Sequence, residues 1–443
     1  MLSVSEVWMY TSSQHIPGWV EQAAKDSLGG LKTRATMIYQ SSVKIEPMEV
    51  YGILTPSAEA QKALKQLDFP VVDSHHHLWE VQGDTPRIQA AWAAFDFEKH
   101  GFENPKTPRV TRPAGYKSPP GTPTDEELAA SLQLMLNTLG STQAIFNTYL
   151  SADHIALIEQ EAAVKLHGSV YIECGWQVHN VENAQAGETK YIEETSHSRS
   201  GGKVSTGIIG HTDLLENTVE QTRSELRAHY AASPHFRGIR YQLAHPGEDA
   251  RFIKSCPEEG VARKEPFLMN FAVLEEFGTT FDIWCYGHQL KDAIFLATKF
   301  PEVKMVLDHF GTPIDIATKP EVYDAWLRDM TELSKLPNVQ VKMSGLMPQL
   351  GFQFEKRHPC TSAGATAREI VHSKFGNMVT DTVKLFGVDR VMYGSNGPVD
   401  YASARLSELL AAYVICCEVA GVSQVELKKI FRENALRFYR LDM

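Results

Sequence analysis

The chain has 443 residues, 43% of them hydrophobic, so it can bury a large core in one big domain or in roughly two or three smaller ones. Its 43 Lys and Arg residues against 54 Asp and Glu residues give a net charge of -11, which argues against an extended nucleic-acid-binding face or attraction to anionic membranes. The six cysteines lack metal-binding spacing, and no signal-peptide or membrane-spanning pattern is found, so a soluble cytoplasmic protein is expected.

The first 66 residues carry mixed signals and are expected to form an N-terminal extension. Residues 35–39 have a β-like pattern and residues 57–67 a helix-like one. No motif in this part points to chemistry, which favours a packing role.

Eight short segments rich in Val, Ile, Tyr and Phe predict β-strands that end on polar residues or glycine. They are residues 69–78, 168–176, 204–214, 236–245, 280–289, 303–311, 339–345 and 390–398. Helix-patterned stretches alternate with them, among them 321–336 and 367–386. Because most strands are too apolar to have one face in water, the order favours a closed (β/α)8 TIM barrel over residues 67–443.

The segments that leave the predicted strands are long, whereas those that enter them are short. The long ones are residues 80–124, 177–203, 246–264 and 347–365. All of them fall on the C-terminal face of the barrel, where such folds keep their chemistry. We interpret them as a lid and pocket wall.

Two histidines mark the end of the first strand. His75 and His77 are spaced i, i+2, so both imidazoles lie on one face with Asp73, while His76 faces the opposite side. Metal-dependent hydrolases present paired ligands in this way, although a solvated polar patch has the same pattern. Asp73 is expected to orient a histidine of the pair from behind.

Polar side chains also end the other predicted strands and would converge on one cavity in a closed barrel. They are Glu173, Arg240, His245, Asp282, His288, Asp308, His309, Asn396 and Asp400. So many strand-end histidines among a total of 17 favour a reaction site over isolated structural roles. The Arg240 guanidinium suits a substrate carboxylate, and a structural ion pair under the loops is the alternative.

Several motifs in order resemble the amidohydrolase-related (amidohydrolase 2) family of TIM-barrel metal-dependent hydrolases. They include VVDSHHHLW, VYIECGW, FRGIRYQLAH, VLDHFGTP, VKMSGL and RVMYGSNGPVD, and the resemblance runs from about residue 69 to the C-terminus. It is closest to the lactonase branch. The family also contains nonhydrolytic decarboxylases of aromatic acids.

The resemblance implies roles for particular residues. His75, His77 and His309 would line the reaction centre and hold a divalent metal, with Zn²⁺ favoured. The implied catalytic set is His75, His77, Glu173, His309 and Asn396, and the implied substrate-binding set is Arg240, His288, Gln289 and Trp176.

Asn396 departs from the family pattern, which places Asp at this position. An amide cannot take a proton and is a poor metal ligand beside a carboxylate. Three accounts follow. In the first, another base replaces Asp, with Glu173, Asp308, Asp400 or neutral His309 as candidates. In the second, the enzyme works without a metal, and its histidines and Arg240 polarise a carbonyl. In the third, the chain is a noncatalytic ligand-binding relative.

The expected function is hydrolysis of a cyclic ester, a carboxylated or polyhydroxylated lactone. Decarboxylation of an aromatic or unsaturated acid is the second expectation. The expected partner is a small-molecule substrate, and self-association into a homo-oligomer stays open.

Overall fold

The computed structural model describes residues 52–80, 95–102, 104–105, 124–176, 181–352 and 364–442. The β-like stretch at 35–39 and parts of the predicted exit loops therefore lie outside the described residues. No helix in the described ranges combines the length and apolar character needed to cross a membrane.

The described residues contain eight parallel strands that pair in chain order. They are β1 (Val71–His76), β2 (Leu166–Ile172), β3 (Gly207–Gly210), β4 (Phe236–Gln242), β5 (Thr280–Trp284), β6 (Met305–Leu307), β7 (Val339–Met343) and β8 (Val391–Tyr393). Backbone N–H groups join the two ends of the sheet, because His77 donates to Gly397 O and Asn396 donates to His75 O, both at 2.8 Å. The predicted barrel is thereby confirmed.

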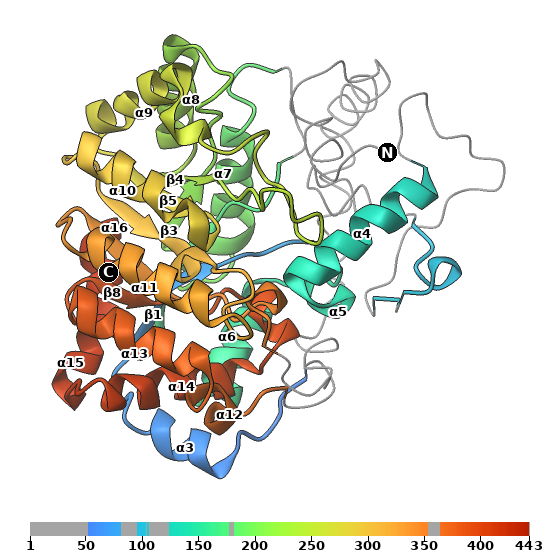
Figure 1. Ribbon diagram of the computed structural model, residues 1–443, viewed down its shortest axis with the longest axis vertical. Helices are drawn as coiled ribbons and strands as arrows, with labels where there is room; N and C mark the ends of the chain where they lie inside the picture. Colours follow the sequence, from blue (N-terminus) through green and yellow to red (C-terminus); the bar gives the residue numbers. More distant parts are fainter. Residues whose placement is uncertain are drawn as a thin grey trace.

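Helices alternate with these strands, and several of them, including α8, α10, α11 and α13, form a layer outside the sheet (Figure 1). They are α3 (Ala58–Leu64), α4 (Asp125–Leu139), α5 (Thr142–Ile145), α6 (Ser151–Ala156), α7 (Ala186–Ile192), α8 (Val219–Ala232), α9 (Glu265–Phe277), α10 (Leu290–Lys299), α11 (Pro320–Ser334), α12 (Ala367–Val371), α13 (Lys374–Phe386), α14 (Leu406–Val419), α15 (Gln424–Lys428) and α16 (Asn434–Tyr439).

The prediction of one helix over 367–386 was wrong in one respect, because α12 and α13 are separate. Ser373 lies between them with extended backbone, and its Oγ accepts a hydrogen bond from Phe375 N at 3.1 Å. A serine in this role starts a new helix, which apolar periodicity alone does not reveal.

The predicted helix at 57–67 is present as α3 and packs on the barrel. Ala60, Ala63 and Leu64 are buried in the main core. Ser57 caps α3, and its N and Oγ donate to Glu408 of α14 at 2.6 and 3.0 Å. The described end of the N-terminal segment is thus held against the helical layer.

A second, smaller core lies at the C-terminal mouth and supports α4 and α5, which stand apart from the helical layer in Figure 1. It contains Phe97, Leu132 and Phe146. Gly140 ends α4 with φ at +95°, and a Cβ there would lie 2.8 Å from Pro348 and 2.9 Å from Ala402. Only glycine allows α4 to approach the segments after β7 and β8 this closely.

Candidate active site

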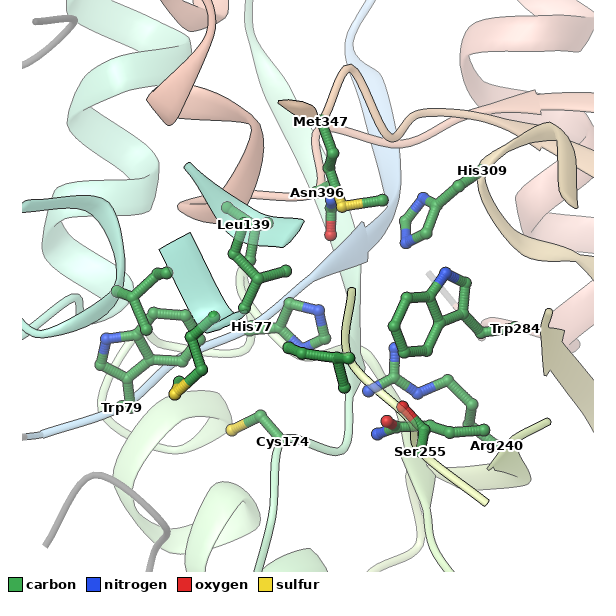
Figure 2. Close-up of a pocket in the computed structure, with 15 residues that line it drawn as sticks. His77, Trp79, Leu139, Cys174, Arg240, Ser255, Trp284, His309, Met347 and Asn396 are labelled. Carbon is green, nitrogen blue, oxygen red and sulfur yellow. The ribbon is translucent and has the colours of Figure 1, made fainter. Parts of the chain in front are cut away.

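One cavity opens among the segments that follow the strands, and it encloses about 720 Å³ including its open mouth (Figure 2). Four residues predicted from the sequence meet there: His77, Arg240, His309 and Asn396. The other lining residues are Trp79, Met135, Leu139, Ile145, Cys174, Gln242, Ile253, Ser255, Trp284, Met347 and Val399.

The two strand-one histidines form part of a directed chain of hydrogen bonds. Lys342 Nζ donates to His75 Nδ1 at 3.2 Å, and His75 Nε2 lies 3.3 Å from His77 Nε2. His77 Nδ1 contacts Ile172 O at 2.9 Å and must carry the proton there, because a carbonyl only accepts. Burial lowers the pKa of His77 to about 3 and that of His75 well below 6.5, so both rings are neutral.

His309 reaches the cavity through an unusual backbone. Its φ is 56°, in the left-handed region, and a Cβ on Gly345 would lie 2.4 Å from His309 Cβ. Its Nδ1 lies 2.8 Å from Ser344 Oγ, and its ring centroid is 4.5 Å from that of His75. Figure 2 shows the ring directed into the cavity. Burial lowers the pKa of His309 well below 6.5, so this ring is also neutral.

A buried cluster of charges lies beneath the histidines. Lys342 Nζ is 2.5 Å from Asp282 Oδ2 and 3.1 Å from Asp308 Oδ1, and Tyr439 Oη donates to Asp282 Oδ2 at 2.8 Å. Burial raises the pKa of Asp282 to about 6. Lys342 was not predicted as a site residue. Its position inside an apolar strand could have indicated a buried ion pair, since lysine is rarely buried without a partner.

The histidine pair fits a tetrahedral metal ion. Zinc with Zn–N bonds of about 2.0–2.1 Å separates two ligand nitrogens by about 3.3–3.4 Å, and the Nε2 atoms of His75 and His77 are 3.3 Å apart. Ligation through Nε2 requires the His75 proton to move to Nδ1, which then gives up the hydrogen bond from Lys342 and faces Asp308 Oδ1 at 3.3 Å, a carboxylate placed as in many metal-bound histidines. His75, Asp308 and His309 also present ligand atoms within 4.8 Å of one another.

Arg240 and Glu173 form a buried ion pair at the cavity. Arg240 Nε donates to Glu173 Oε1 at 2.7 Å, and Nη2 donates to Glu173 O at 2.6 Å. Burial opposes the charge on Glu173, but Arg240 outweighs it and leaves the pKa of Glu173 lowered. Nη1 of Arg240 has no hydrogen-bond partner among the described residues, so it is available to a ligand in the cavity.

Asn396 is oriented by Asp400, four residues further along the chain. Asn396 Nδ2 donates to Asp400 Oδ1 at 2.7 Å, and Asp400 Oδ2 accepts from the backbone N–H groups of Gly345 and Leu346. The amide nitrogen is therefore occupied, and Figure 2 shows the Asn396 oxygen directed into the cavity. Burial raises the pKa of Asp400 to about 7.

Asp73 and His76 lie behind the site and do not line the cavity. Asp73 Oδ1 accepts from the backbone N–H groups of His75 and Ser395 at 3.0 and 2.8 Å. His76 faces away from its neighbours, as the strand pattern indicates, and stacks on His154 with ring centroids 4.4 Å apart. Asp73 thus holds the end of β1 beside the segment after β8.

Three of the predicted substrate-binding residues are not brought to this cavity. His288 Nε2 lies 3.0 Å from Glu259 Oε1 with its side chain 46% exposed. The Gln289 side chain hydrogen-bonds to three backbone groups, and Trp176 packs against Tyr191. The cavity is lined instead by Gln242, Ser255 and Trp284, which no sequence pattern singled out.

Comparisons with known proteins place the chain among relatives. The family model described as amidohydrolase (Amidohydro_2) matches residues 181–441. Uncharacterized protein y4mH of Sinorhizobium fredii is 28% identical over 306 residues, covering 69% of this chain and 90% of that protein. An L-fucono-1,5-lactonase of Burkholderia ambifaria is 25% identical over 258 residues, covering 58% of this chain and 76% of the lactonase.

A solved structure supports the fold independently. An amidohydrolase from Burkholderia multivorans with bound zinc has a TM-score of 0.54 and 20% identity, covering 84% of this chain and all of that one. With a matched region that spans more than half of its length, the chain belongs to the amidohydrolase family.

Proposed function

We propose that this protein hydrolyses a cyclic ester, opening a lactone ring in the cavity at the mouth of the barrel. The observation that carries the proposal is the meeting of His77, His309, Arg240 and Asn396 around one space, with His75 directly behind. The similarity to an L-fucono-1,5-lactonase supports the same reaction class.

The chain's own residues divide the work of ester hydrolysis. Arg240 Nη1 would donate to the ring carbonyl oxygen, on which negative charge develops. The Asn396 side-chain oxygen would accept a hydrogen bond from the attacking water. The neutral His309 would take the proton of this water at Nε2, because its Nδ1 is engaged with Ser344. As the bond between the carbonyl carbon and the ring oxygen breaks, His309 would pass this proton to the ring oxygen, which leaves as a hydroxyl group of the hydroxy acid.

His75 and His77 would hold a divalent metal, and zinc suits their nitrogen donors and spacing. A bound metal supplies polarisation of the carbonyl and a lower pKa for its water. Asp308 would orient His75 from behind. Glu173 would keep Arg240 in position, since both of its described contacts with Arg240 are short.

Decarboxylation is supported less well by the cavity. That reaction needs an acidic group to protonate carbon, and the described lining residues include no Asp or Glu. Decarboxylation is therefore one of the outcomes that the following experiment distinguishes.

The test is a panel of lactones followed by proton release at constant pH, with aromatic acids followed by carbon dioxide release. We expect lactone turnover by the wild type and a loss of about 10²–10⁴-fold in His309→Ala. His372→Ala, which removes an exposed histidine that does not line the cavity, is the matched control and should keep the wild-type rate. Carbon dioxide as the only product, or full lactone turnover in His309→Ala, would overturn the proposal.

A further inference from the structure

The cavity has two chemically different sides. The polar side consists of His77, Arg240, Gln242, Ser255, His309 and Asn396. The apolar wall consists of Trp79, Met135, Leu139, Ile145, Met347 and Val399. Figure 2 shows Trp79 and Leu139 across His77 from Arg240 and His309. Among the described lining residues, a ligand therefore meets hydrogen-bonding groups together with the Trp284 ring at one end and hydrocarbon at the other.

The apolar wall is a fixed part of the structure. Met135 and Ile145 belong to the small core beneath α4 and α5, so their positions are set by packing. Thr138 Oγ1 accepts from Ile253 N at 3.0 Å, which ties α4 to the segment after β4. The one polar atom of Trp79 is used away from the cavity, because its Nε1 donates to Asn147 O at 2.8 Å.

Few polar atoms are left for a ligand on the polar side. Gln242 Nε2 is bound to Glu173, Asn396 Nδ2 to Asp400, and His309 Nδ1 contacts Ser344. Ser255 Oγ, in contrast, is buried and has no hydrogen-bond partner among the described residues.

Besides Gln242 Oε1, for which the described residues show no partner, the remaining atoms match the needs of one ester group. Arg240 Nη1 can donate to its carbonyl oxygen, while the Asn396 oxygen and His309 Nε2 serve the water. Ring hydroxyls placed against the apolar wall would lose their water without gaining a partner, at about tenfold or more in binding for each one.

We propose that the substrate is a lactone with an apolar body, an aromatic or branched alkyl group that lies against the apolar wall, and that polyhydroxylated sugar lactones are poor substrates. This inference rests on the proposed lactone hydrolysis and narrows its substrate class. The apolar group gains binding at about fourfold per buried methylene.

Kinetics on a graded series tests the inference. The series is δ-valerolactone, its butyl-, hexyl- and phenyl-substituted forms, and an aldonolactone. We expect kcat/KM to rise about fourfold per added methylene, with the aldonolactone slower than the unsubstituted ring. An aldonolactone that is hydrolysed faster than the phenyl lactone would overturn the inference and leave lactone hydrolysis standing.

A binding measurement separates this inference from the proposed reaction. Phenyl-substituted cyclohexanone and a polyhydroxylated tetrahydropyran resemble the two substrate classes but have no ester to hydrolyse. Binding is followed by the fluorescence of the cavity tryptophans. We expect the apolar compound to bind at least tenfold more tightly, and equal or reversed affinities would overturn the inference even in an enzyme that turns over no lactone.

Two variants of α4 localise the effect. Leu139 lines the cavity, whereas Leu136 packs on the same small core without lining it. Leu139→Gln should lower the ratio of kcat/KM for the phenyl and unsubstituted lactones about tenfold, and Leu136→Gln should leave this ratio unchanged. Equal changes in both variants would show that the apolar wall does not select the substrate.

Discussion

The polar side of the cavity and its apolar wall are built by different parts of the chain. His77 and His309 follow strands of the barrel and Arg240 lies near the end of β4, and closure of the barrel brings these residues, distant in sequence, to one mouth. Met135 and Leu139 belong to α4, inserted after β1 and supported by its own small core. Barrel geometry therefore places the polar groups, while a segment inserted after β1 supplies the apolar wall beside them.

The largest effect is expected below the polar side, at Lys342. Lys342→Met leaves Asp282 and Asp308 buried without their shared cation. Removing one partner of a buried ion pair costs about 3–5 kcal/mol in the free energy of unfolding. Urea denaturation measures this, with the exposed Lys304→Met as control. A loss under about 1 kcal/mol would contradict a buried ion pair between Lys342 and these carboxylates.

The next effect concerns Asn396 and Asp400 and depends on pH. Burial raises the pKa of Asp400 from 3.8 to about 7 in the folded protein. Protonated Asp400 therefore contributes to the stability of the fold at low pH, and this contribution is lost as the pH rises through about 7. Asn396→Asp places a second carboxylate against it, and two adjacent carboxylates cannot both ionise without cost. We expect this variant to lose about 2–4 kcal/mol relative to the wild type above pH 7 and less at pH 5.

The exchanged double variant sharpens this prediction. In Asn396→Asp/Asp400→Asn, the amide at 400 can accept from Gly345 N and Leu346 N and donate to the carboxylate at 396. Thermal unfolding at pH 5 and pH 8 should show most of the lost stability restored. The double variant also places a carboxylate toward the cavity, so zinc binding by equilibrium dialysis should tighten. An equal loss in the single and double variants would contradict the assigned hydrogen bonds.

A smaller effect is expected where α4 meets the barrel. Gly140→Ala inserts a Cβ 2.8 Å from Pro348 and 2.9 Å from Ala402 at positive φ. Overpacking costs about 1–3 kcal/mol. Gly421→Ala is the matched control, because Gly421 also has positive φ but nothing within 4 Å of the added Cβ. If both variants lose the same stability in denaturant titrations, packing of α4 is not the cause.

The smallest effect is expected at Trp79 in the apolar wall. Trp79→Phe keeps an aromatic ring but removes the hydrogen bond to Asn147 O. The loss should be about 0.5–1.5 kcal/mol, measured by thermal unfolding. The preference for the phenyl lactone over the unsubstituted lactone should survive. Loss of this preference would show that the indole nitrogen contributes to substrate selection.

The sequence predicted the barrel well because its strands are short runs of buried apolar residues that alternate with helix-patterned stretches. The pairing of His75 and His77 followed from their i, i+2 spacing on one strand. His309 was placed by a resemblance, yet its approach depends on a left-handed backbone and on Gly345, which no periodicity encodes.

Other parts of the site depend on contacts that no local pattern carries. His288 and Gln289 follow β5 as expected, but His288 pairs with Glu259 and Gln289 with backbone groups. The carboxylate of Asp400 could be named from the sequence, whereas its hydrogen bond to Asn396 required the closed turn after β8. The apolar wall could not be predicted either, because it depends on how the segment inserted after β1 packs over the mouth of the barrel.

The most direct test of lactone hydrolysis at this mouth uses water labelled with oxygen-18 and mass spectrometry of the product. We expect a ring-opened hydroxy acid with one labelled oxygen in its carboxylate, formed by the wild type and lost in His309→Ala. Unlabelled product, release of carbon dioxide, or undiminished product from His309→Ala would contradict it.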